Sequence, residues 1–165
     1  MDAYLAIASK RDERRYAERP VPVEVLERAL DAARLSGSSK NGQPWRFLLV
    51  ESDERRRALA EAVYSPANVA GAAAVVAVLG KGFDLGRAAQ NLMLAAWNDG
   101  LVSCPNGIRD RTAAAEALGL ADPEELGIVL SLGYPARPRE PEARGAEEWS
   151  AGANRRPLAE LVTRL

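Results

Sequence analysis

The chain has 165 residues, of which 47% are hydrophobic and 27% charged, so it can form a compact domain with a buried core. Its net charge of −1 argues against a general nucleic-acid-binding protein. It has one cysteine, Cys104, and no histidine, which excludes an internal disulfide, a CxxC zinc site and a Ser-His-Asp triad.

Localisation and domain count follow from the same sequence. The apolar run Val69–Leu79 is too short to span a bilayer, and the sequence shows no signal peptide. The single cysteine favours a reducing compartment, so we expect a cytoplasmic protein. We expect residues 1–165 to form one domain.

Hydrophobic periodicity predicts alternating helices and strands. In chain order the sequence predicts a short helix at Met1–Ala8, a helix at Val23–Leu35, a strand at Trp45–Glu51, a helix at Asp53–Val63 capped by Ser52, a buried strand at Ala72–Leu79, a long helix at Asp84–Asp99, a helix at Arg111–Leu118 and a buried strand at Leu126–Gly133. The Pro- and Gly-rich stretch Ala136–Gly152 is predicted to be a mobile loop, and Leu158–Leu165 a short helix or strand. This order favours an α+β or α/β layered domain with few strands.

Two basic clusters are candidate anion sites. The first surrounds Asp12 and contains four cations within six positions: Lys10, Arg11, Arg14 and Arg15. Guanidinium groups bind phosphate through paired hydrogen bonds, whereas the alternative is a solvated turn whose cations pair with nearby glutamates. The second cluster, Arg155 and Arg156, is either a further phosphate clamp or a basic surface tail.

The segment SGSSKNGQPWRF, residues 36–47, places polar side chains directly before a predicted strand. It can offer donors and acceptors to a heteroaromatic ring and its polar chain, through Ser38, Ser39, Asn41 and Gln43. The alternative is an ordinary loop with Trp45 in the core. No nucleophile here has an evident base, so covalent catalysis is not expected.

The sequence SCPNG, residues 103–107, follows the long helix and can present backbone N–H groups to a ligand. The alternative is a plain connection between two elements. Cys104 is more typical of a small buried residue than of a nucleophile.

In their order along the chain, these segments resemble the FMN-dependent nitroreductase family. The similarity extends from about Tyr4 to Leu161, and its most specific part is SGSSKNGQPWRF, which resembles the family's Ser-rich Asn-x-Gln-Pro-Trp segment. KRDERRYAERPVP resembles the basic opening signature, DLGRAAQNLMLAAWNDGLVSCPNG the Asp-x-Gly-x-Ala-x-Gln-Asn helix with its following loop, and NRRPL the basic C-terminal motif.

The resemblance implies a three-layer α+β fold, in which helices flank a central mixed β-sheet, and an intertwined homodimer with FMN at its interface. In this family the long helix is buried against the partner, which would explain the apolar run Leu92–Trp97. The implied partners are a second copy and a small-molecule substrate, without nucleic acid or membrane, and no metal is expected.

The resemblance also assigns roles to the candidate residues. Lys10 and Arg11 would hold the FMN phosphate and ribityl chain, and Arg155 and Arg156 would complete the phosphate site. Arg14 would lie near the flavin pyrimidine, where a cation stabilises the negative charge that collects on reduction. Ser38, Ser39 and Asn41 would line the ribityl chain and ring from the other subunit, with Gln43 near the ring or the interface. Pro105, Asn106 and Gly107 would lie along the ring and direct backbone N–H groups toward its N5 atom.

Three positions depart from the family pattern. Asp12 replaces the usual serine, and a carboxylate beside a phosphate is unfavourable unless it turns toward Arg11 or Arg14. Gly37 replaces a common proline. The segment between residues 63 and 84 is short, so the family's usual excursion over the active site is trimmed.

The implied activity is that of an FMN-dependent oxidoreductase. NADH or NADPH would reduce the flavin, which would then reduce a nitroaromatic, a quinone or another electrophile by a ping-pong route, without a catalytic protein residue. One alternative is a flavin carrier or sensor without turnover, which the short 63–84 segment supports. Asp12 motivates two others: a domain that has lost its cofactor, and a flavin-fragmenting enzyme that makes dimethylbenzimidazole.

Overall fold

The computed structural model describes residues 1–121 and 124–165. The chain divides into two compact units, one formed by residues 11–139 and the other by residues 1–10 together with 140–165. In the part described, none of the helices combines the length and apolar character that a membrane span requires.

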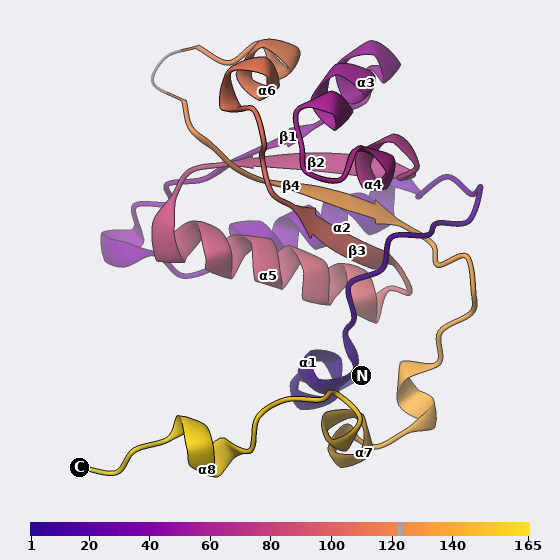
Figure 1. The fold of residues 1–165 in the computed structure, drawn as a ribbon, viewed down its shortest axis with the longest axis vertical. Coiled ribbons are helices and arrows are strands. Elements are labelled where there is room, and N and C mark those ends of the chain that lie inside the picture. The colour runs from indigo at the N-terminus through magenta and orange to yellow at the C-terminus, as the bar shows by residue number, and fades with distance from the viewer. Residues whose placement is uncertain (122–123) are drawn as a thin grey trace. The chain divides into compact units, whose positions relative to one another are not determined.

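A four-stranded sheet forms the centre of the larger unit (Figure 1). Its strands lie in the order β1-β2-β4-β3 and comprise β1 (Arg46–Leu49), β2 (Ala74–Leu79), β3 (Val102–Asn106) and β4 (Leu126–Gly133). Every neighbouring pair is antiparallel. Among the described residues, the one parallel pairing is an isolated bridge between Asp12 and Ser103, so the expected mixed character of the sheet is limited to that bridge.

Helices cover both faces of this sheet (Figure 1). One face carries α2 (Val23–Arg34) and α5 (Gly82–Asn98), and the other carries α3 (Asp53–Glu61), α4 (Pro66–Ala70) and α6 (Arg111–Leu118). The side chains of β2 alternate between the two hydrophobic clusters because successive residues of a strand point to opposite faces. All six residues of β2 are buried, as a central strand between two helical layers requires. The predicted three-layer α+β fold is confirmed.

The long helix α5 is buried largely by its own chain. Leu92, Met93 and Ala96 join a cluster that includes Leu26 of α2 and Leu130 of β4. Packing within one chain therefore accounts for much of the apolar run Leu92–Trp97, without the partner helix that the family resemblance suggested.

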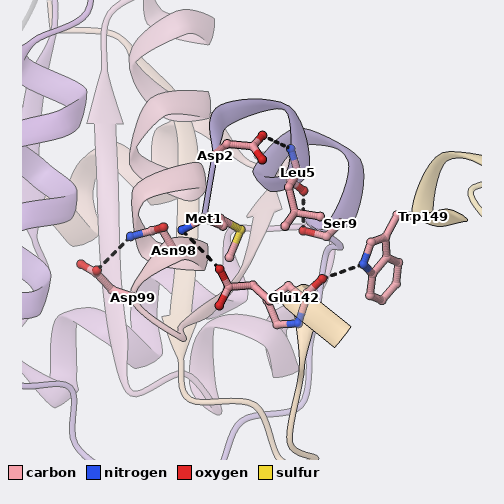
Figure 2. Close-up of polar contacts among 9 residues, drawn as sticks. Met1, Asp2, Leu5, Ser9, Asn98, Asp99, Glu142 and Trp149 are labelled. Carbon is pink, nitrogen blue, oxygen red and sulfur yellow. Dashed lines mark hydrogen bonds and ion pairs between the residues drawn. The ribbon is translucent and has the colours of Figure 1, made fainter. Parts of the chain in front are cut away.

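The smaller unit contains α1 (Ala3–Ser9), a 3-10 turn at Pro141–Ala143, α7 (Ala146–Ala151) and α8 (Leu158–Leu161), and α1 packs against α7. Figure 2 shows how this unit begins. The carboxylate of Asp2 accepts a hydrogen bond of 2.9 Å from the Leu5 N–H and so caps α1. The N-terminal amino group lies 3.6 Å from the Glu142 carboxylate.

Two predictions about irregular segments need correction. The stretch Ala136–Gly152, predicted to be a loop, contains the 3-10 turn and α7. The indole N–H of Trp149 donates a 2.8 Å hydrogen bond to the Pro141 carbonyl, which ties these two elements together (Figure 2). The region of residues 102–106 is strand β3 rather than a plain connection. β3 is an edge strand, where a proline such as Pro105 is tolerated.

Candidate functional site

The basic segment Arg11–Arg14 lies along the outer edge of β3. Asp12 forms its bridge with Ser103, and the Glu13 N–H donates a 3.1 Å hydrogen bond to the Ser103 carbonyl. Because β4 occupies the other side of β3, the basic segment extends the sheet at this edge. The structure thus brings two of the predicted clusters together, the cations of the opening segment and the SCPNG segment.

Arg14 makes direct contact with β3. Its guanidinium is exposed, and the pKa of Arg14 is raised chiefly by a hydrogen bond to the Cys104 side chain and, more weakly, by Asp12. Arg14 therefore stays cationic beside β3. The carboxylate of Asp12 acts on Arg14, which is the arrangement under which an aspartate is tolerated near an anion site.

Asn106 turns its side chain into the protein. Its Nδ2 donates to the carbonyls of Cys104 (2.9 Å) and Val129 (3.2 Å) and to the Ser131 hydroxyl (3.1 Å). Its Oδ1 accepts a 2.9 Å hydrogen bond from Nδ2 of Asn68, in α4. Asn106 as a whole residue is only 3% exposed, so a ligand at this end of β3 would meet the exposed Gly107 rather than Asn106.

Tyr16 and Ser131 continue this buried polar cluster. The Tyr16 hydroxyl lies 2.8 Å from the Ser131 Oγ, and the Ser131 hydroxyl donates to the Cys104 carbonyl at 3.2 Å. Burial raises the pKa of Tyr16 to about 12. Sequence reasoning did not select Tyr16, Ser131 or Asn68. A usable signal was present, because Ser131 interrupts the apolar strand sequence LGIVLSLG.

Gly107 follows β3 and is exposed. Its carbonyl accepts a 3.0 Å hydrogen bond from the Tyr64 N–H, and a Cβ at this position would lie 3.2 Å from the Tyr64 ring. Tyr64 is itself 71% exposed and stands at the start of the segment 63–84. An open backbone and an exposed aromatic ring therefore lie side by side at the end of β3, with Pro105 half-buried two residues earlier.

The Ser-rich segment before β1 is held in an unusual conformation. Lys40, Asn41 and Gln43 have positive φ angles of 52°, 54° and 47°. The Gln43 N–H donates to the Ser38 Oγ at 2.9 Å, and the Ser39 N–H donates to the Asp84 carboxylate at 3.1 Å. Left-handed backbone in residues other than glycine is costly and often marks a functional segment. The side chains of Ser39, Asn41 and Gln43 are exposed, and that of Ser38 is half-buried.

The two groups of candidate residues lie at opposite edges of the sheet. The Ser-rich segment leads into β1, whereas the basic segment and Gly107 adjoin β3, and β2 and β4 lie between these strands. An open groove of about 490 Å³ borders the β1 side and is lined by residues that include Leu30, Gln43, Trp45 and Phe47. One chain therefore does not bring the two groups to one place.

The remaining predicted residues belong to the smaller unit. Lys10 ends α1, and its N–H donates to the Ala6 carbonyl at 3.0 Å. Arg155 and Arg156 are exposed and follow Asn154, whose φ is +50°. Their part in a phosphate site stays a prediction.

Comparison with known proteins gives the family. The model of the nitroreductase family matches residues 7–82 and 81–134. A Methanothermobacter thermautotrophicus protein, provisionally named NADH dehydrogenase/NAD(P)H nitroreductase, is 34% identical over 151 residues, which cover 82% of this chain and 78% of the relative.

Solved structures agree with this assignment. A Desulfovibrio desulfuricans protein, provisionally described as a nitroreductase and solved in complex with FMN, superposes with a TM-score of 0.84 at 27% identity, covering 100% of this chain and 98% of the other. A nitroreductase family protein from Clostridium difficile superposes with a TM-score of 0.82 at 26% identity, covering 99% and 98% of the two chains. The chain belongs to the nitroreductase family.

Proposed function

We propose that this protein is an FMN-dependent oxidoreductase that takes hydride from NADH or NADPH and delivers it to a small electrophilic molecule. The observation that carries the proposal is the basic segment Arg11–Arg14, paired along β3 next to the exposed backbone of Gly107. The FMN complex of the Desulfovibrio relative supports the choice of cofactor.

The residues at the β3 edge fit FMN. Arg11 and Arg14 offer guanidinium donors of the kind that bind phosphate and stabilise a reduced flavin pyrimidine. Asp12 acts electrostatically on Arg14, so the two opposite charges partly offset each other beside a phosphate. Gly107 has no side chain and is exposed, which leaves its backbone open to a planar ring.

The other predicted contacts complete the proposed site. Lys10, Arg155 and Arg156 would join Arg11 at the phosphate. Ser38, Ser39, Asn41 and Gln43 would supply donors and acceptors from the far side. Bound FMN would accept hydride and pass it on, so the protein residues need only bind, orient and stabilise charge.

A homodimer with composite sites follows from the position of these groups. The Ser-rich segment and the basic segment lie at opposite edges of one sheet, whose two faces are covered by helices. Three strand spacings separate β1 from β3, or about 14 Å. If both segments contact one FMN, they come from two copies of the chain, and two equivalent sites result.

The proposed second substrate is a nitroaromatic, a quinone or a similar electrophile. It would bind after the oxidised nicotinamide leaves, in a ping-pong order, because both substrates must approach the same flavin face. The exposed Tyr64 ring beside Gly107 offers an aromatic surface for a planar molecule.

The spectrum of the purified protein tests the cofactor, and stopped-flow mixing tests the activity. We expect oxidised-flavin absorbance that bleaches on addition of NADH or NADPH and returns on addition of a quinone. A flavin that neither nucleotide bleaches would instead indicate a carrier or sensor. A colourless protein that takes up no added FMN would contradict the proposal as a whole.

Charge reversal at Arg11 tests the site itself. Arg11→Glu should weaken FMN binding by roughly ten- to a hundredfold, because a hydrogen bond between charged groups is lost and a repulsion replaces it. Arg57→Glu, an exposed arginine of α3, makes the same charge change away from the proposed site and should leave the affinity unchanged. Equal affinities of the two variants in a fluorescence titration would refute the assignment of Arg11.

A further inference from the structure

We propose that Asn106 is a positioning residue whose buried side chain, linked to Tyr16, Ser131 and Asn68, holds the backbone of residues 104–107 and the Arg11–Arg14 segment in one fixed arrangement. The inference rests on the proposed function in one respect, namely that this backbone and these cations face FMN. It adds three residues, Tyr16, Ser131 and Asn68, that the sequence did not single out.

The orientation of the Asn106 amide is set by its surroundings. Two backbone carbonyls and one hydroxyl lie within 3.2 Å of Nδ2, and carbonyls can only accept. On the other side, Oδ1 faces an amide donor of Asn68. An inverted amide would place oxygen against oxygen, so a single rotamer is favoured, and the backbone that carries it is fixed as well.

Ser131 is the junction of the network. Its oxygen lies within hydrogen-bond distance of the Cys104 carbonyl, the Tyr16 hydroxyl and Nδ2 of Asn106, and either hydroxyl can donate in the Tyr16–Ser131 pair. One donor and two acceptor positions are the full capacity of a hydroxyl. Because Ser131 belongs to β4, an inner strand of the sheet, and is fully buried, both partners are anchored to the interior of the fold.

Tyr16 connects Ser131 to the basic segment Arg11–Arg14. Its hydroxyl also lies 3.1 Å from the Glu13 carbonyl, within the stretch that runs along β3. Its ring packs against Gly133, where an added Cβ would come within 2.9 Å of the ring. Replacement by phenylalanine therefore removes the hydroxyl link and retains the packing.

Asn68 closes the network from α4. Its Nδ2 donates to Asn106 and lies 3.8 Å from the Cys104 sulfur, the same sulfur that contacts Arg14. The strand end, the basic segment and α4 are thus tied to one another through buried polar groups. Loss of a single member leaves its neighbours unsatisfied and loosens the others.

Hydrogen exchange of the full-length protein without added FMN tests the mechanical part. Tyr16→Phe and Ser131→Ala should each make the amides of residues 104, 106 and 107 exchange roughly three- to tenfold faster. Tyr4→Phe and Ser150→Ala remove the same groups from exposed positions and should change nothing there. Unchanged protection in both network variants would overturn the proposal.

Flavin properties test the functional part. At saturating FMN, Tyr16→Phe should give a more negative flavin midpoint potential than wild type, because Arg14 is held less firmly near the reduced ring. Tyr16→Phe and Asn68→Ala, which do not touch each other, should have non-additive effects on FMN affinity, since both act through Ser131 and Asn106. If amide hydrogen exchange became faster while the flavin midpoint potential and the FMN affinity stayed unchanged, the network would have only a structural role. That result would refute the role of Asn106 as a positioning residue. A wild-type protein that binds no FMN would instead refute the proposed function. The hydrogen-exchange rates, measured without FMN, would still show whether the network holds the backbone of residues 104–107.

Discussion

Tyr16 combines a half-buried ring, a hydroxyl that lies 2.8 Å from the Ser131 hydroxyl and a raised pKa. Its pKa rises from 10.0 to about 12, chiefly because burial disfavours the phenolate. The unfolded chain therefore loses this proton at lower pH than the folded chain does. The stabilisation that Tyr16 contributes is fully present below about pH 10 and is lost as the pH rises toward 12.

This titration gives a pH prediction. The free energy of unfolding, measured with urea at about pH 8 and about pH 11, should fall more in wild type than in Tyr16→Phe. Tyr4→Phe, which alters an exposed ring, should follow the wild-type decline. An identical decline in wild type and Tyr16→Phe would mean that the hydroxyl of Tyr16 is not buried in solution.

The sequence predicted single residues unevenly, for a physical reason. Arg14 and Gly107 belong to local patterns, and the structure places both at the β3 edge. Asn106 was selected as a ligand contact, but the direction of its side chain depends on Asn68 and Ser131, which are far away in sequence. Such tertiary hydrogen bonds leave no periodic or compositional trace.

At the scale of elements, the contact between β4 and the start of α5 depends on a glycine. A Cβ added to Gly127 would lie 2.7 Å from the Gly80 carbonyl and would also meet the Leu85 side chain. Gly127→Ala should therefore destabilise the protein by roughly 1–3 kcal/mol, because the backbone at Gly80 cannot move without shifting the strand end. Denaturant unfolding measures the difference.

Gly86→Ala is the matched control. Gly86 is exposed within α5, and an added Cβ meets nothing within 4 Å. Alanine in an exposed helix interior should stabilise the protein by roughly 0.5–1 kcal/mol. If Gly127→Ala were as stable as Gly86→Ala, β4 and α5 would not pack as closely as described.

Helices and strands were predicted correctly where one strong sequence pattern covered many residues. Helices α2, α3, α5 and α6 and the buried strands β2 and β4 were predicted from periodicity and apolar runs. β3 was missed because VSCPN contains a proline and an asparagine, and its strand conformation is imposed by pairing with β4. The short helices α4 and α7 were missed because five or six residues carry too little periodicity.

At the scale of the whole molecule, a site shared between two copies of the chain predicts how FMN binding depends on which copies form the dimer. The basic segment adjoins β3 and the Ser-rich segment leads into β1, at the two edges of one sheet. Arg11→Glu should therefore disable the half of each site that one copy supplies. Ser39→Trp, at an exposed position of the other half, should disable the complementary half while retaining the backbone hydrogen bond to Asp84.

At an FMN concentration that saturates wild type but lies well below the Kd of either variant, each variant alone should bind little FMN, because every site in its homodimer carries the defect. When the two variants are unfolded together and refolded in equal amounts, half of the dimers should be mixed, and each mixed dimer should contain one intact and one doubly altered site. About a quarter of all sites should then regain FMN, as flavin absorbance per chain measures. A site built within one chain predicts no recovery on mixing, since every copy would carry one of the two defects in its own site.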